Sequence, residues 1–269
     1  MNMHNASSTN PISVQDKTCY YFHFNLIVTG KGERKHLPKL FKSLMATETC
    51  SFQVIRFIGQ RSPITSEKRK NKYEMVGTRK AIPNKDQDEI GLPARKHLQD
   101  DPCQLVILID DLEHDRRQNA QEVFNRYRRA FDTILTDSQK TRASVHFLVN
   151  MLEAYYFADV QSLNSVLSLN PSLEDYKDDV EDIRHPKAEI LKLYPHFHES
   201  DDGGKILDVL DVEHVLSRSD TCAWLRTLFV WCIKALKDHP SYESFSFFNK
   251  FQFFDGKLSE ITSSQLEQF

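Results

Sequence analysis

The chain has 269 residues, of which 40% are hydrophobic and 27% are charged, and its formal net charge is −3. Such a chain can bury a substantial core, and 18 Phe against 8 Gly favour packed structure over disorder. The small net charge excludes a global attraction to nucleic acid, so binding of that kind needs a local basic patch.

The first 18 residues are polar and predict a flexible N-terminal tail, without the apolar core of a signal peptide. No run approaches 18 apolar residues, so we expect no membrane span and a cytoplasmic location. The cysteines are dispersed and form no CxxC pair, which predicts reduced thiols packed as small apolar groups. The five are Cys19, Cys50, Cys103, Cys222 and Cys232.

Four segments have the composition of β-strands. The run CQLVILIDD at 103–111 is almost continuously apolar and ends in acids, which is typical of a buried parallel strand. The segment 20–30 is rich in aromatic and β-branched residues and ends in Gly. In chain order, the expected strands are 20–30, 51–59, 103–111 and 144–149.

Helical patterns separate these strands. Apolar residues recur at helical spacing between Leu37 and Leu44 and again between Ala120 and Leu135, and a further helix is expected over 86–99. This alternation predicts an α/β fold for residues 19–160, with a mostly parallel sheet flanked by helices.

From residue 161 onward strand-like runs disappear, which predicts a helical C-terminal region, 161–269, packed on the α/β domain. The acidic segment 172–183 predicts a solvated loop or helix surface. The tail 245–254 contains six Phe in ten residues. We expect it to close the core, and a partner-binding surface is the alternative.

Acids follow two of the expected strands, and ligands of open α/β sheets bind beyond the carboxyl ends of strands. Carboxylates that converge there repel each other unless a cation lies between them, and Mg²⁺ prefers such oxygen ligands. Each acid taken alone can instead be a helix cap or a surface group. The acids are Glu33 after the first strand and Asp110, Asp111, Glu113 and Asp115 after the third.

Five segments together resemble the Toprim domain, the fold of type IA topoisomerases, bacterial primases and overcoming-lysogenization-defect nucleases. More specifically, the chain resembles a bacterial Toprim-like family found beside AAA-type ATPases and linked to phage defence. The segments are VTGKGERKHLPKLF (28–41), VILIDDLEHD (106–115), HFLVNMLEAYYFAD (146–159), HPKAEILKLY (185–194) and GGKILDVLDVEHVLSR (203–218).

The resemblance implies a Toprim-like Rossmannoid fold and a site for Mg²⁺ or Mn²⁺. Its metal ligands would be Glu33, Asp111 and Glu113, with Asp110, Asp115 and Glu153 in support. Lys187 and Lys205 match basic positions of the family and would face a phosphate, although surface lysine is the simpler interpretation of each.

One position departs from the family pattern. Thr29 stands where the family usually has Glu, the usual candidate for proton transfer or metal positioning. A Thr hydroxyl ligates a metal weakly and cannot act as a base near neutral pH. In the second motif, Asp111-Leu112-Glu113 replaces the DxD pattern and keeps its charge.

Basic residues gather in two places that could contact a nucleic-acid backbone. A solvated loop is the competing interpretation of the first group, and a protein-binding face that of the second. The candidates are Lys68, Arg69, Lys70, Lys72, Arg79 and Lys80 in the first group, and Arg116 and Arg117 in the second.

Two functions from different classes follow. The first is an Mg²⁺-dependent nuclease, or nuclease subunit, that cleaves DNA or RNA phosphodiesters in anti-phage defence. The second is a catalytically silent Toprim-like module that binds a partner ATPase or nucleic acid, and Thr29 favours it.

Overall fold

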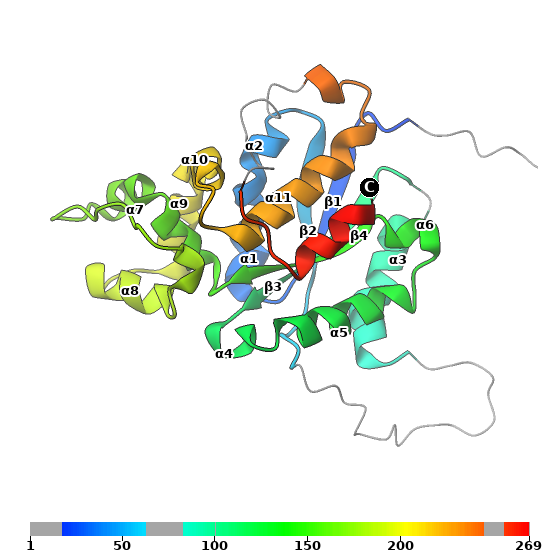
Figure 1. The fold of residues 1–269 in the computed structure, drawn as a ribbon, viewed down its shortest axis with the longest axis horizontal. Coiled ribbons are helices and arrows are strands. Elements are labelled where there is room, and N and C mark those ends of the chain that lie inside the picture. Colours follow the sequence, from blue (N-terminus) through cyan, green and yellow to red (C-terminus); the bar gives the residue numbers. More distant parts are fainter. Residues whose placement is uncertain (1–17, 63–82, 100, 245–255, 269) are drawn as a thin grey trace, which may run out of the picture.

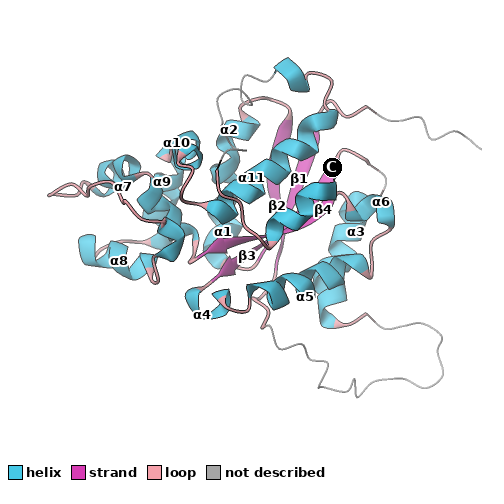
Figure 2. Cartoon of the chain, viewed as in Figure 1, coloured by secondary structure: helices cyan, strands magenta, loops and turns pink. Residues whose placement is uncertain are grey.

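The computed structural model describes residues 18–62, 83–99, 101–244 and 256–268. A parallel four-stranded sheet of order β2-β1-β3-β4 forms its centre, and helices cover both faces (Figures 1 and 2). The predicted α/β fold is therefore confirmed. The strands are β1 (Phe22–Val28), β2 (Cys50–Phe57), β3 (Gln104–Leu112) and β4 (Ala143–Val149).

The helices before β4 lie within or close to the predicted segments. The segment after β1 is divided into three short helices, because Pro38 at the start of the second has no N–H for an α-helical bond. These helices are α1 (Lys31–His36), η1 (Leu37–Phe41), α2 (Lys42–Met45), η3 (Gln87–Gly91), α3 (Leu92–Leu98), α4 (His114–Arg117), α5 (Ala120–Asp132) and α6 (Asp137–Lys140).

The region after β4 is helical, as the sequence predicts. Figure 1 shows α7 to α10 grouped beside α1, whereas α11 lies across the sheet. The main helices are η4 (Leu152–Ala158), α7 (Val160–Leu167), η5 (Val180–Asp182), α8 (Pro186–Leu193), η6 (Glu199–Gly203), α9 (Gly204–Val209), α10 (Val212–Ser217), α11 (Ala223–Ala235) and η10 (Thr262–Gln268).

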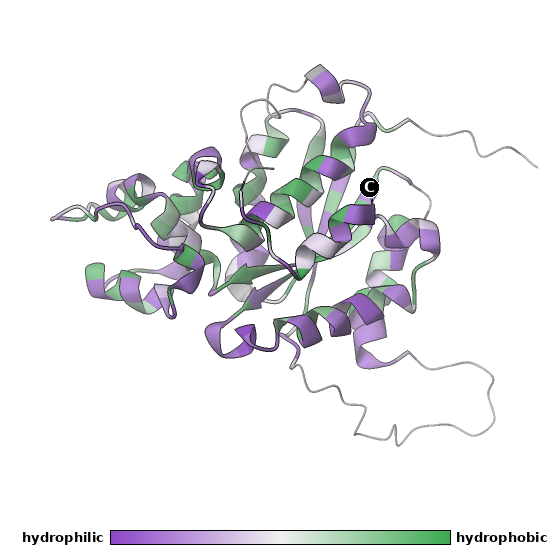
Figure 3. Cartoon of the chain, in the orientation of Figure 1, coloured by the Kyte–Doolittle hydropathy of each residue, from purple (hydrophilic) through white to green (hydrophobic). Residues whose placement is uncertain are grey.

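Both faces of the sheet are buried, which explains the continuous apolar run of β3. Leu105, Ile107 and Ile109 pack in the cluster that contains α11, and the alternating Val106 and Leu108 pack with α3 and α5. In Figure 3, α11 is mainly hydrophobic, whereas α5 has a hydrophilic outer surface. The C-terminal helix α11 thus supplies one cover of the sheet.

An aromatic stack fixes the first helices and α11 against β1 and β2. The Phe52 ring lies between two stacked partners, with centroid distances of 4.4 Å to Phe24 and 4.0 Å to Phe41. Phe41 in turn stacks on Phe229 of α11 at 5.3 Å. Burying four such rings removes a large apolar area from water and orients the chain that follows β1.

The acidic segment 172–183 is only partly the solvated loop that was expected, because Glu181 is 1% exposed. Its carboxylate accepts hydrogen bonds from the backbone N–H groups of Trp224 (3.0 Å) and Leu225 (3.3 Å) and from the Tyr155 hydroxyl (3.0 Å). Glu181 therefore satisfies free donors at the start of α11, which its N-cap residue leaves uncapped.

The prediction that all five cysteines are reduced is wrong for two of them. Cys19 and Cys103 form a disulfide, with 5.4 Å between their Cα atoms. They precede β1 and β3, and these strands are parallel neighbours, so the fold brings together residues 84 positions apart. Cys50, Cys222 and Cys232 are free and buried, as expected.

Several predictions fall outside the described residues. They concern nearly all of the N-terminal tail, the Phe-rich segment 245–254 and the basic residues Lys68, Arg69, Lys70, Lys72, Arg79 and Lys80. Within the part of the chain that the structure describes, no helix has the length and apolar character needed to cross a membrane.

His146 in β4 gives a test of the packing against α11. Its ring is fully buried, lies edge-on to Trp231, and has no hydrogen-bond partner at either nitrogen. Burial lowers the pKa of His146 to about 3, so the folded protein binds fewer protons than the unfolded chain between that value and 6.5. The stability contributed by neutral His146 therefore falls as the pH drops below 6.5, by at most about 1.4 kcal/mol per pH unit.

We expect His146→Leu to leave the melting temperature unchanged or higher at pH 7, and to reduce the loss of stability between pH 7 and pH 5. Circular-dichroism melts at both pH values measure the effect. An unchanged pH dependence in the variant would contradict this account of His146.

Candidate functional site

The strand order creates a crevice at the carboxyl ends of β1 and β3. The chain passes from β1 to β2 on one side and then crosses to β3 on the other. The connections after these two neighbours therefore diverge, and such a switch point is where open α/β sheets bind ligands. Thr29 follows β1 at this crevice, and Asp110 and Asp111 lie at the end of β3.

Thr29 connects the two strand ends. Its hydroxyl donates to Asp110 Oδ1 at 2.5 Å and accepts from the backbone N–H of Asp111 at 3.1 Å. The residue is 5% exposed, so both bonds are shielded from water. Thr29 thus has a positioning role at the ends of β1 and β3.

Asp110 has donors on both carboxylate oxygens. Besides Thr29, it accepts hydrogen bonds from the Tyr127 hydroxyl (3.1 Å) and from both terminal nitrogens of Arg116 (2.6 and 3.3 Å). Arg116 also donates to the carbonyl oxygens of Arg61 and Asp111. Its side chain is directed into the protein, where it neutralises a fully buried carboxylate, rather than toward a nucleic-acid backbone.

Three other carboxylates form the carboxylate cluster, which consists of Glu33, Asp111 and Glu153. They come from the first turn of α1, the end of β3 and the first turn of η4. Their exposed fractions are 4%, 6% and 3%, respectively. The carboxyl ends of three strands, β1, β3 and β4, therefore place negative groups in one buried region.

The cluster is electrostatically unfavourable without a cation. Burial, and next the charge of Glu33, raise the pKa of Asp111 well above its usual range. Burial also raises the pKa of Glu33, with contributions from Glu199 and Asp110, and raises that of Glu153 to about 7, with contributions from Glu199 and Glu33. Each group resists ionisation because its neighbours are negative and water is excluded.

Two oxygens of the cluster lack a hydrogen-bond partner. They are Asp111 Oδ1 and Glu153 Oε1, and both are buried. Buried polar atoms are normally paired, and an unpaired one costs about 1–3 kcal/mol. These two atoms are therefore free to accept a proton or to bind a ligand.

Small residues after β1 make room for the acids. A Cβ on Gly30 would lie 1.5 Å from Glu33 Oε2, and one on Gly32 would lie 2.7 Å from Glu199 Oε1. Both are closer than real side-chain contacts, so a Cβ at either position would displace the glutamate carboxylate from its present place. The GKG sequence thus allows two glutamates to approach the backbone of the β1–α1 turn.

Glu199 and Lys187 form the outer side of the cluster. Lys187 of α8 makes an ion pair with Glu199 of η6, and this hydrogen bond is the main cause of the raised pKa of Lys187. The charge of Lys187 also lowers the pKa of Glu153. Lys205 instead pairs with Asp202 at 3.2 Å, on a side chain that is 65% exposed.

The turn after β4 has an unusual backbone. Asn150 and Met151 have consecutive positive φ values of 57° and 74°; Asn tolerates this conformation, but it is costly for Met. The Asn150 N–H bonds to the Leu112 carbonyl at 3.0 Å, and its side-chain amide donates to the Glu181 carbonyl at 2.8 Å. These bonds hold the strained turn that directs Glu153 into the crevice.

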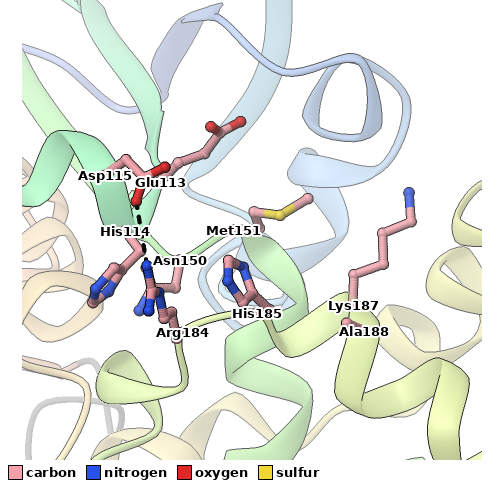
Figure 4. A pocket seen from close by; sticks show the side chains of 9 residues that line it. All are labelled: Glu113, His114, Asp115, Asn150, Met151, Arg184, His185, Lys187 and Ala188. Atoms are coloured by element: carbon pink, nitrogen blue, oxygen red, sulfur yellow. Dashed lines mark ion pairs between the residues drawn. The ribbon is translucent and has the colours of Figure 1, made fainter.

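A pocket of about 250 Å³ adjoins the cluster (Figure 4). We call it the α8 pocket; it is lined by residues 113–115, by Asn150 and Met151, and by Arg184, His185, Lys187 and Ala188. The predicted ligands Glu113 and Asp115 belong to this pocket rather than to the cluster and are exposed. Glu113 still contributes to the raised pKa of Asp111.

Arg117 lies outside the α8 pocket. It pairs with Asp182 at 2.6 Å and donates to the Glu181 carbonyl at 3.0 Å. Its side chain is 34% exposed, so part of it remains accessible for the predicted backbone contact.

Sequence reasoning missed three residues of the site: Glu199, Tyr156 and Asn150. Burial and the charges of Glu153, Glu33 and Glu199 raise the pKa of the Tyr156 hydroxyl, which places it among these acids. Glu199 begins η6, 166 positions after Glu33, and no local pattern indicates that the two residues approach each other. For Asn150, an Asn directly after a buried strand was an available signal, because Asn tolerates positive φ.

Among the residues with described positions, no three His, Cys, Asp or Glu side chains are already arranged as ligands of one metal ion. The cluster is thus a set of neighbouring buried acids without the geometry of a completed coordination sphere.

A comparison with protein families matches residues 28–229 to a domain of unknown function, DUF4276. The chain belongs to the DUF4276 family. The match includes β2, β3 and β4, the last residue of β1 and every member of the carboxylate cluster. No curated protein and no solved structure matches this DUF4276 chain.

We expect Thr29→Val to destabilise the DUF4276 chain by about 1–3 kcal/mol, because it removes a donor from buried Asp110 and leaves the Asp111 N–H unpaired. Thr29→Ser keeps the hydroxyl and should retain most of the stability. Urea unfolding of both variants measures the difference. Equal stability of the Val variant and the natural chain would contradict the positioning role.

We expect Glu153→Gln to stabilise the metal-free protein at pH 8 more than at pH 5. The pKa of Glu153 in the folded state is about 7, above its usual 4.5, so its protonated form favours folding. That contribution is complete below pH 4.5 and is lost as the pH rises through 7. Melting temperatures in EDTA at both pH values measure the effect, with exposed Glu122→Gln as control. An equal change in melting temperature at both pH values would contradict this account of Glu153.

Proposed function

We propose that this protein is a divalent-metal-dependent hydrolase of nucleic-acid phosphodiesters, with Mg²⁺ or Mn²⁺ as cofactor. The observation that supports the proposal is the carboxylate cluster, in which three buried acids at the ends of β1, β3 and β4 raise one another's pKa values near the switch point. Phosphodiester cleavage needs charge neutralisation at a site of this kind.

The chemistry of the cluster fits a hard cation. Its unpaired oxygens, Asp111 Oδ1 and Glu153 Oε1, are the type of donor that Mg²⁺ prefers. Mutual repulsion keeps carboxylates apart when no cation separates them, so the absence of a completed ligand set is compatible with this assignment. When bound, the ion neutralises charge on the phosphate and lowers the pKa of a water molecule.

The residues divide into different roles. Glu33, Asp111 and Glu153 would hold the metal, whereas Asp110 would not, because Thr29, Tyr127 and Arg116 already occupy its oxygens. Asp110 and Thr29 would instead fix the end of β3 so that Asp111 faces the crevice. Such support of a ligand by its neighbours is typical of metal sites.

Lys187 would bind the phosphate of the substrate. It lies close enough to Glu153 to affect its pKa, and its side chain is 41% exposed. Its partner Glu199 is 35% exposed, so water competes for this ion pair and its net stabilisation is small. A phosphate can therefore replace Glu199 as the partner of Lys187.

A second candidate is a catalytically silent module that binds a partner. Thr29 favours it, because the acid that the Toprim pattern places there is absent. The association with an AAA-type ATPase and the role in phage defence remain predictions from the resemblance.

Glu33→Gln and Asp111→Asn test the proposal. Each should abolish Mg²⁺-dependent cleavage of labelled DNA and RNA and remove the rise in melting temperature produced by millimolar Mn²⁺. Neither should unfold the protein, because each change relieves repulsion. The controls Glu122→Gln and Asp238→Asn change the same groups at exposed positions.

Metal-dependent cleavage that persists in both site variants would overturn the assignment. A natural chain that neither cleaves nor gains stability from either metal would favour the silent module.

A further inference from the structure

The α8 pocket contains the groups needed to bind a phosphate. Arg184, His185 and Lys187 lie along one side of it, at the start of α8 (Figure 4). Among the residues that the structure describes, the ion-pair partner of Arg184 is Asp115, at 3.9 Å, and the two side chains are 64% and 84% exposed. Such an exposed, long pair contributes little, so Arg184 is available to an anion.

The backbone of α8 adds further donors. The N–H groups of Lys187 and Ala188 belong to the first turn and have no acceptor within the helix. His185 at the N-cap position makes no cap hydrogen bond. Both residues line the pocket, so its wall combines free amides, the positive end of the helix and cationic side chains.

A second observation indicates that the ligand also carries a hydrogen-bond donor. Asn150 lines the same pocket and is 1% exposed, yet its Oδ1 atom has no partner. Its amide nitrogen already donates to the Glu181 carbonyl, which fixes Oδ1 as the remaining acceptor. A phosphate dianion has no hydrogen-bond donor, whereas a sugar hydroxyl or a base amino group has one.

The size of the pocket limits the ligand. About 250 Å³ is below the usual range of pockets for drug-sized molecules, about 300–1,000 Å³. It suits one nucleotide unit rather than a dinucleotide. Glu113 and Asp115 are exposed, and the Glu113 carboxylate points away from Arg184 in Figure 4.

We propose that the α8 pocket binds a nucleoside monophosphate unit, with the phosphate at the N-terminus of α8 and beside Arg184, and a sugar or base donor toward Asn150. As a subsite for the terminal nucleotide of a nucleic-acid substrate, this assignment rests on the proposed function. The binding itself needs no metal.

Isothermal titration calorimetry of the full chain with adenosine 5′-monophosphate in EDTA tests the pocket separately from cleavage. We expect binding to be weaker for inorganic phosphate and for adenosine, because each supplies only part of the contacts. Arg184→Glu should weaken the affinity for the nucleotide by at least about tenfold, as expected for the loss of one charged hydrogen bond.

Arg95→Glu, at an exposed position on α3, makes the same charge change and should leave binding unchanged. Glu33→Gln should also retain it, because the site for the metal is not involved. Three results would contradict the assignment of the α8 pocket. They are no nucleotide binding at millimolar concentration, equal affinity for phosphate and nucleotide, and equal loss of binding in Arg184→Glu and Arg95→Glu. Intact nucleotide binding without metal-dependent cleavage would contradict the proposed hydrolase activity but support nucleotide binding in the α8 pocket.

Discussion

Repulsion between buried carboxylates is the constraint on which this site depends. A parallel sheet places all its strand ends on one edge, and the order β2-β1-β3-β4 makes β1 and β3 neighbours at the switch point. Acids that follow these strands have to share a small region with little water. The apolar packing of both sheet faces, including the aromatic stack against α11, holds them there. Stability of the core therefore supports an arrangement that is locally unfavourable.

Hydrogen-bond donors and cations compensate some of the buried acids fully and others only in part. Asp110 has an arginine, a tyrosine and a threonine as donors, and Glu181 has backbone N–H groups and a tyrosine. Both carboxylates are thus satisfied within the protein. Asp111 and Glu153 each keep a buried oxygen without a partner, and Lys187 is the cation that lowers the pKa of Glu153. The unsatisfied pair is where a bound cation would contribute most.

The sequence was sufficient to predict the α/β fold and to place Glu33 and Asp111 at the same edge of the sheet, because strand periodicity and acids at strand ends are local signals. It could not assign separate roles to Asp110 and Asp111, since that depends on the inward direction of Arg116. Long-range approaches also escaped prediction. The Glu199 carboxylate lies where a Cβ of residue 32 would be, and Cys103 meets Cys19 because β1 pairs with β3.

Proton release on metal binding tests the central claim most directly. If the cluster shares protons near neutral pH, a divalent cation has to displace them. Calorimetric titration of the protein with Mn²⁺ at pH 7, in two buffers of different ionisation enthalpy, counts the protons released. This account predicts a positive number that falls as the pH is raised to 9. Mn²⁺ binding without proton release at pH 7 would contradict it.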